Sequence, residues 1–251
     1  ALIGYAKGDD PIFEFIKNDI GPFLWTPWEI FSKKFPDSDV VPQELTIISW
    51  ILPQTEATKR DNRSREDFPA ERWIRSRNYG EAFNIKLAHH VVKELQEHGF
   101  DSVAPAQYSE WAWQESRRYG FASNWSERHI AYAAGLGTFS LCDGLITAKG
   151  KAMRCGSVVS RIDIPATPRK YEKHNSYCLF FSMGGCKKCI KRCPNEAITE
   201  KGHDKSKCRE FLFDKVSPYA KSTYGMESYG CGLCQTDVPC ESGIPLAQET
   251  A

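Results

Sequence analysis

The chain has 251 residues, and its 33 basic and 32 acidic side chains leave a net charge of +1. This length predicts one or two domains, and the balanced charge argues against a polybasic nucleic-acid arm or an acidic disordered tail. Uncharged apolar runs such as residues 45–52 are far short of the roughly 20 residues of a membrane span, and no signal-peptide pattern opens the chain, so we expect a cytoplasmic protein.

The first part of the chain alternates strand and helix patterns. Residues 2–6 and 45–52 are rich in apolar and β-branched side chains, which predicts two strands. A helix is predicted over 10–20, where an Asp-Pro pair precedes apolar residues at helical spacing. The sequence Thr-Pro-Trp-Glu at 26–29 is a capping box, which predicts a short helix through Phe31. Residues 54–68 are polar and charged, so we expect an exposed loop.

Two further helices are predicted from periodicity. In residues 83–95, large apolar side chains step by four, and Gly99 stands where a helix usually ends. A second helix is predicted over 126–134, ended by Gly135. Turn signals then bracket short apolar runs, predicting strands over 145–147 and 156–164.

A proline-containing basic segment at 165–175 suggests a domain boundary at 165/166. We therefore expect one domain over 1–165 and a second over 166–251. The second domain contains most of the cysteines, which are the most informative feature of the chain.

Eight of the ten cysteines lie in one C-terminal stretch, and the first 141 residues have none. The eight are Cys178, Cys186, Cys189, Cys193, Cys208, Cys231, Cys234 and Cys240. A disulfide scaffold would spread its bridges along the chain and follow a secretory signal, so metal binding is the better interpretation. We interpret Cys142 and Cys155, outside this stretch, as buried small apolar residues.

The densest part of the stretch follows the bacterial ferredoxin motif C-x₂-C-x₂-C-x₃-C-P. Cys186, Cys189 and Cys193-Pro194 match its last three positions, while its first position falls on Met183. Cys178 is the obvious substitute, because a glycine-containing loop could fold it back toward the others.

Eight thiolates are what two [4Fe–4S] clusters require. In ferredoxins the fourth cysteine of the motif binds the other cluster, which suggests the following partition. We assign one cluster to Cys178, Cys186, Cys189 and Cys240 and the other to Cys193, Cys208, Cys231 and Cys234. Zinc is the nearest alternative, since two C-x-x-C pairs can form a four-cysteine zinc site, but it would leave four cysteines and the C-P pair unexplained.

The chain resembles the epoxyqueuosine reductase and reductive dehalogenase superfamily. The resemblance rests on the segment Glu127-Arg128 to Ala134-Gly135-Leu136-Gly137, the Cys193-Pro194 motif, Cys208, and the Tyr229-Gly230-Cys231 segment. It implies an α+β fold with a nitroreductase-like N-terminal domain that holds a base-off cobalamin, and a C-terminal ferredoxin-like domain with two [4Fe–4S] clusters. It also implies an enzyme, a reductase that passes electrons through the clusters to a corrinoid or a small-molecule substrate.

Two departures from the epoxyqueuosine reductase pattern disfavour that substrate. Residues 121–126 contain no carboxylate where those enzymes have an acidic proton donor, and Ser140-Leu141-Cys142 replaces their Gly-Lys-Asn. By analogy with reductive dehalogenases, Tyr119 is a candidate proton donor, with Tyr79 and Tyr132 as competitors, and Arg128 is a candidate ligand-binding residue. Gly135 and Gly137 are candidates for the corrinoid side of the site.

The partners follow from the same reasoning. The basic side chains around the first cysteine motif (Lys187, Lys188, Lys191 and Arg192) form either an ordinary solvated face or a docking patch for an acidic donor such as ferredoxin or flavodoxin. The arginine-rich stretch 60–79 also contains acids that offset its charge, so tRNA is the less favoured partner. The alternative function is an electron-transfer or activating protein that reduces a separate corrinoid protein and binds no corrinoid itself.

Overall fold

The computed structural model describes residues 1–246, which divide into two compact units. Unit 1 consists of Ala1–Ile51, Asn84–Leu136 and Cys155–Lys170. Unit 2 consists of Leu52–Phe83, Gly137–Arg154 and residues 171–246. The chain passes from one unit to the other at Lys170/Tyr171 and at four earlier points, and the expected division at 165/166 stays a prediction. Both units mix helices and strands, as predicted.

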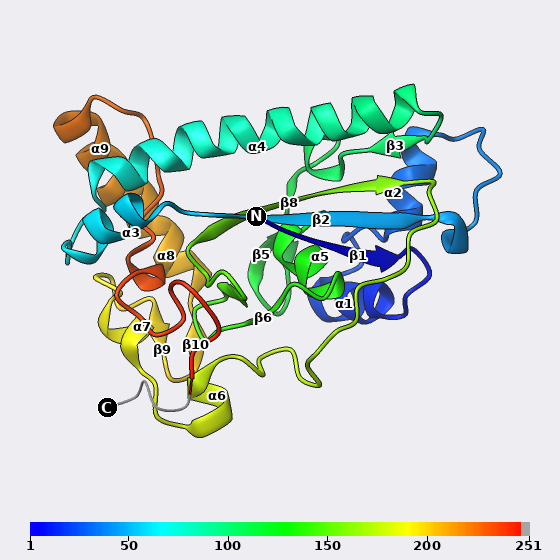
Figure 1. Ribbon diagram of the computed structural model, residues 1–251. Coiled ribbons are helices and arrows are strands. Elements are labelled where there is room, and N and C mark those ends of the chain that lie inside the picture. The colour runs from blue at the N-terminus through cyan, green and yellow to red at the C-terminus, as the bar shows by residue number, and fades with distance from the viewer. Residues whose placement is uncertain (247–251) are drawn as a thin grey trace. The chain divides into compact units, whose positions relative to one another are not determined.

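A four-stranded sheet in the order β1-β2-β8-β3 is the centre of unit 1 (Figure 1). Its strands are β1 (Leu2–Lys7), β2 (Thr46–Pro53), β8 (Met153–Ser160) and β3 (Ser102–Val103). β1 pairs antiparallel with β2, and β3 pairs antiparallel with β8. The strands predicted over 2–6 and 45–52 are confirmed, and the one predicted over 156–164 lies a few residues earlier.

Close packing inside this sheet depends on Gly156 in β8. A side chain there would lie 2.6 Å from the ring of Trp50 on β2. The indole N–H of Trp50 donates to the Asn84 side chain at 2.8 Å, and the Asn84 amide donates to the Cys155 carbonyl at 3.1 Å. A buried asparagine is therefore satisfied by both of its neighbours.

The remaining elements of unit 1 surround this sheet. They are α1 (Ile12–Ile20), α2 (Pro27–Lys34), α5 (Glu127–Ala133), the hairpin β4–β5 (Trp113–Ser116 and Gly120–Ser123), and short 3₁₀ turns at Pro42–Glu44 and Pro105–Gln107. The predicted capping box is confirmed, because Thr26 accepts from the Glu29 N–H and Glu29 accepts from the Thr26 N–H. The helices predicted over 10–20 and 126–134 are confirmed within two residues.

Helix α4 (Glu71–Glu97) begins twelve residues before the predicted start at 83. The predicted apolar face is partly wrong, because Phe83 is 57% exposed while Asn84 and Ala88 are buried. The reason is that Asn84 finds polar partners inside unit 1, so a polar residue occupies the buried position.

The expectation of an exposed loop over 54–68 is wrong, because this segment contains α3 (Glu56–Arg63). Thr55 caps the helix by accepting from the Thr58 N–H. Asn62 is fully buried, donates to the Thr236 hydroxyl at 3.1 Å and accepts from the Ala70 N–H at 3.0 Å. A polar segment is thus buried because tertiary hydrogen bonds satisfy its side chains.

Unit 2 is built from short elements joined by turns. Besides α3, these are β6 (Gly137–Phe139), β7 (Leu145–Thr147), α6 (Leu179–Met183), α7 (Lys188–Lys191), β9 (Ile198–Thr199), β10 (Gly202–His203), α8 (Lys205–Phe211), a π-helical turn (Leu212–Val216), α9 (Ser217–Tyr224) and a 3₁₀ turn (Leu233–Gln235). The strand predicted over 145–147 is confirmed as β7. Within residues 1–246, none of the helices has the length and apolar character needed to cross a membrane.

Candidate metal centres

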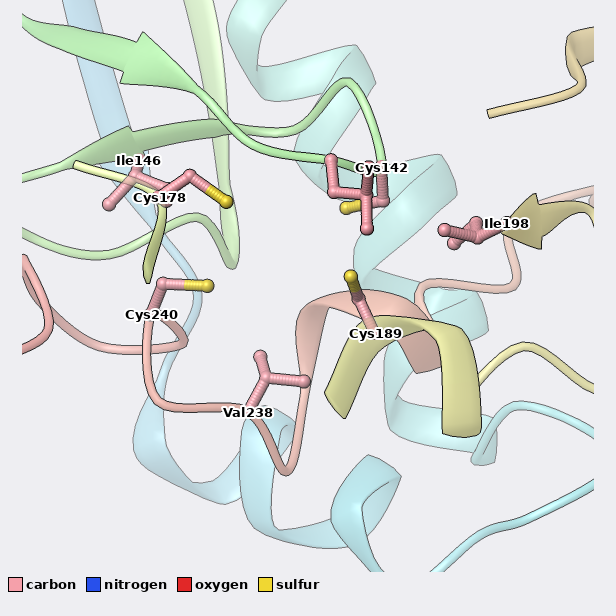
Figure 2. Packing of buried hydrophobic residues seen from close by; sticks show 8 residues of the cluster. Cys142, Ile146, Cys178, Cys189, Ile198, Val238 and Cys240 are labelled. Atoms are coloured by element: carbon pink, nitrogen blue, oxygen red, sulfur yellow. The ribbon is translucent and has the colours of Figure 1, made fainter. Parts of the chain in front are cut away.

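Four of the eight candidate ligand cysteines line one cavity in unit 2. They are Cys178, Cys186, Cys189 and Cys240, the four that the sequence assigns to one cluster. Figure 2 shows the sulfurs of Cys178 and Cys240 turned into the same space and that of Cys189 turned toward Cys142. Apolar side chains pack around these thiols, among them Leu141, Ile146, Ile198 and Val238.

Short elements position these four side chains. Cys178 immediately precedes α6, and Cys189 lies within α7. The turn that carries Cys240 is held by the Lys151 N–H, which donates to the Cys240 carbonyl at 2.9 Å. Met183, which occupies the ferredoxin position that lacks a cysteine, is 52% exposed, whereas Cys178 is buried.

The other four cysteines also interact with one another. Burial raises the pKa of the Cys231 thiol to about 12, and the neighbouring Cys208 and Cys193 add to the rise. The charge of Cys231 in turn helps to raise the pKa of Cys234, which lies three residues later. The Cys193 sulfur accepts a hydrogen bond from the Ala197 N–H at 3.3 Å.

The raised thiol pKa values of Cys231 and Cys240 are consistent with a site that binds a metal cation. Burial also raises the pKa of Cys240, to about 11, although the nearby Lys151 ammonium lowers it. Thiolates crowded into an apolar environment repel each other, and a bound metal reverses this by stabilising the deprotonated sulfur. Soft thiolates suit iron–sulfur clusters and zinc, so the chemistry of this donor set fits the predicted clusters.

Across residues 1–246, no three Cys, His, Asp or Glu side chains converge closely enough to hold one metal ion. The thiols of a four-iron cluster bind different iron atoms and need not converge on one point. The assignment of the eight cysteines to two clusters stays a prediction.

Sequence reasoning missed a buried polar contact beside these cysteines. The Lys151 ammonium donates to the Cys142 sulfur at 3.3 Å, and the Ser140 hydroxyl lies 3.3 Å from the same sulfur. Hydrogen bonds from the Cys189 and Cys234 thiols, assisted by Lys151, hold the pKa of Cys142 well below its usual value. Cys142 is buried, as expected of a small apolar residue, but its partners are polar. No motif in the sequence marks Lys151, which follows an ordinary Lys-Gly turn.

The candidate catalytic residues lie in unit 1. The Tyr119 hydroxyl, at the β4–β5 turn, donates to the Asp19 carboxylate at 2.6 Å. Arg118 also pairs with Asp19, and its guanidinium lies 5.3 Å from the Tyr119 ring centre. Arg128 is an exposed residue of α5. The role of Tyr119 and Arg128 in a reaction stays a prediction.

Packing explains both glycines assigned to the corrinoid side. Gly135 has a positive φ of 76°, and a side chain there would lie 3.2 Å from Thr167. A side chain on Gly137 would lie 2.2 Å from the Ile146 carbonyl oxygen, across the β6–β7 pair. Their assignment to a corrinoid site stays a prediction.

The basic residues around the first cysteine motif have different environments. Arg192 donates to four backbone carbonyls, those of Leu233, Thr236, Arg65 and Asn62, at 2.7–3.3 Å. Arg192 therefore has a structural role, because its guanidinium joins the segments that contain these four carbonyls. Lys187 forms an ion pair with Glu200, and Lys188 and Lys191 are exposed.

The arginines of residues 60–79 are engaged with other side chains of unit 2. Arg72 pairs with Asp61, and Arg75 pairs with Glu71. Arg63 binds Glu241, which has a buried carboxylate. These contacts reduce the positive charge that the stretch presents to solvent.

Comparisons with known proteins identify relatives of this chain. No protein-family model matches it. An epoxyqueuosine reductase of Bacillus cereus is 30% identical over 125 residues, which are 47% of this chain and 30% of the relative. The chain thus matches less than a third of the length of that curated relative.

Solved structures share the fold at low sequence identity. A selenomethionine-labelled epoxyqueuosine reductase superposes with a TM-score of 0.51 at 17% identity, covering 98% of this chain and 63% of that one. A reductive dehalogenase, described with a mechanism for B12-dependent dehalogenation, gives 0.58 at 12% identity, covering 98% and 30%. The predicted resemblance is confirmed: part of the chain is similar in sequence to an epoxyqueuosine reductase, and its fold is similar to those of an epoxyqueuosine reductase and a reductive dehalogenase.

Proposed function

We propose that the chain is an iron–sulfur reductase whose unit 2 holds two [4Fe–4S] clusters. The ligands would be Cys178, Cys186, Cys189 and Cys240 for one cluster and Cys193, Cys208, Cys231 and Cys234 for the other. The observation that carries this proposal is the grouping of the thiols. Four line one cavity, and among the other four the charges of Cys193 and Cys208 help to raise the pKa of the Cys231 thiol.

When bound, such clusters supply and accept single electrons at potentials set by hydrogen bonding, charge and solvent exposure. The chain's own residues control those conditions. Leu141, Ile146 and Val238 keep water away from the first group of thiols. The Ala197 N–H stabilises negative charge on the Cys193 sulfur, because it already donates to that atom.

The electrons would pass to a corrinoid or a small-molecule substrate in the N-terminal domain, in an epoxyqueuosine reductase-like or reductive dehalogenase-like reaction. In that domain Tyr119 is a proton donor of suitable chemistry, because its hydroxyl already hydrogen-bonds to Asp19 beside Arg118. The absence of a carboxylate in residues 121–126 argues against epoxyqueuosine as the substrate.

The electron donor would be an acidic redox protein such as ferredoxin or flavodoxin. Lys188 and Lys191 are exposed beside Cys189 and Cys193, where complementary charge would speed the encounter. Arg192 is not part of this patch, because backbone carbonyls occupy its guanidinium. A tRNA partner is less favoured, because acidic side chains pair with Arg72 and Arg75.

Single cysteine replacements test the clusters and their partition. Two full clusters contain about eight irons per chain, and we expect C178S and C208S each to lose the signals and iron of one cluster. C155S is the matched control, because Cys155 is not a proposed ligand, and the C155S protein should keep all eight irons. A C178S protein that retains two complete clusters would contradict the proposed ligand set.

A cobalamin titration of the anaerobic protein tests the acceptor. A reductase of the proposed kind changes the visible spectrum of added cobalamin in proportion to protein concentration. A protein with two full clusters and no spectral change would instead be the alternative, an electron-transfer protein that reduces a separate corrinoid protein.

A further inference from the structure

Lys151 is a buried cation inside the cysteine-rich part of unit 2. Its residue is only 2% exposed, and its side chain lines the cavity formed with Cys178, Cys186, Cys189 and Cys240. Its ammonium group donates to the Cys142 sulfur at 3.3 Å and also hydrogen-bonds to the side chain of Cys240.

A buried ammonium group without a counter-charge is strongly disfavoured, because it has lost its hydration. In this environment the negative charge comes from sulfur. The Cys142 sulfur lies 3.3 Å from the ammonium group, and Cys178, Cys186, Cys189 and Cys240 line the same cavity. The ammonium group therefore lies where it would offset the negative charge of thiolates bound to a cluster.

The contact partner of Lys151 lies between the two sets of cysteines. Cys142 belongs to the same buried cluster as Cys178, Cys189 and Cys240 of the first set, and Cys234 of the second set packs against this cluster. Figure 2 shows the Cys142 and Cys189 sulfurs facing each other. Cys142 thus links the ammonium group to both proposed clusters, although neither cluster requires it as a ligand.

We propose that Lys151 is the fixed counter-charge of the two clusters, and that it raises their reduction potential. A cluster gains one negative charge on reduction, and a neighbouring cation stabilises the reduced form more than the oxidised form. Removing the cation would therefore make reduction harder. The inference rests on the proposed function, since it concerns the electronic properties of the clusters proposed there.

Two variants distinguish the charge of Lys151 from its packing. K151M keeps the length of the side chain but removes the charge, and K151R keeps the charge. K149M is the matched control, because Lys149 lies two residues earlier on the exposed turn. The readout is an anaerobic redox titration followed by electron paramagnetic resonance, together with iron analysis of each variant.

At the wild-type midpoint we expect K151M to show at least a tenfold lower ratio of reduced to oxidised cluster, which corresponds to a midpoint lower by 59 mV for one electron. K151R and K149M should stay within about threefold of the wild type, which is roughly half that shift. A K151M protein with full iron and an unchanged ratio would overturn the proposal.

K151M could also fail to assemble its clusters, so K151Q is a second neutral variant. Loss of iron in both neutral variants but not in K151R supports the counter-charge through cluster retention. Loss of iron in all three would show that Lys151 is needed for packing only and would overturn the proposal. A wild-type protein without iron would instead refute the proposed function, so the two failures are distinguishable.

Discussion

Glu241 anchors the turn that carries Cys240, and its removal should destabilise unit 2. The Arg63 Nε lies 2.8 and 3.0 Å from the two carboxylate oxygens of Glu241, and the Arg63 Nη2 binds the same group. The Asp237 N–H donates to Glu241 at 2.6 Å. The Glu241 side chain is only 6% exposed, so E241A removes a buried charge with three donors.

The structure sets the size of this effect. Breaking a fully buried ion pair costs about 3–5 kcal/mol, but Arg63 is 36% exposed and can recover hydration, which reduces the loss to about 2 kcal/mol. The orphaned Asp237 N–H adds about 1 kcal/mol. A total of about 3 kcal/mol lowers the melting temperature of a chain of this size by about 6–12 °C.

Thermal unfolding of the iron-loaded protein, followed by circular dichroism under anaerobic conditions, measures this shift. E227A is the control, because Glu227 forms an ion pair with Lys221 in which both side chains are at least 70% exposed. We expect E227A to melt within about 2 °C of the wild type, since exposed pairs contribute little. An E241A protein that also melts within about 2 °C would refute the reasoning.

Three further outcomes follow from other contacts. Gly150→Ala should destabilise the fold by at least about 2 kcal/mol in thermal melts, because the φ of Gly150 is 78° and the new Cβ would lie 2.0 Å from a backbone oxygen. Gly225→Ala is the control, since Gly225 has a φ of 66° but no atom within 4 Å of the new Cβ, and it should cost about 1 kcal/mol. Asn84→Ala should cost about 1–3 kcal/mol in the same assay, because it removes the buried acceptor of the Trp50 indole N–H, and a change below about 0.5 kcal/mol would contradict this. In the iron-loaded protein, a thiol reagent should label at most Cys142 and Cys155, and removal of the iron with a chelator should make the eight ligand thiols reactive as well. Equal numbers of labelled thiols before and after chelation would argue against thiol-bound iron.

Local patterns predicted the elements whose stability is local. The capping box at Thr26 forms α2 because both of its hydrogen bonds lie within four residues. The strands β1, β2 and β7 follow from short apolar runs, which fit only a buried sheet position.

Tertiary contacts explain what the patterns missed. Residues 54–68 look solvated, yet Asn62 is buried because its partners, Thr236 and Ala70, lie elsewhere in the chain. Phe83 appears to belong to an apolar face, but the burial of Asn84 turns that face outward.

The candidate site shows the same division. Cysteine spacing placed Cys178, Cys186, Cys189 and Cys240 in one set, and these four line one cavity. The spacing carries no information about Lys151, whose importance depends on burial and on the sulfur that it contacts. A lysine two residues after an exposed turn lysine looks ordinary until the fold removes it from water.

The most direct test of the central claim is the iron and acid-labile sulfide content of the anaerobically purified chain. Two [4Fe–4S] clusters predict about eight irons and eight sulfides per chain, with a paramagnetic signal after one-electron reduction. Fewer than about six irons per chain, or zinc in place of iron, would contradict the account.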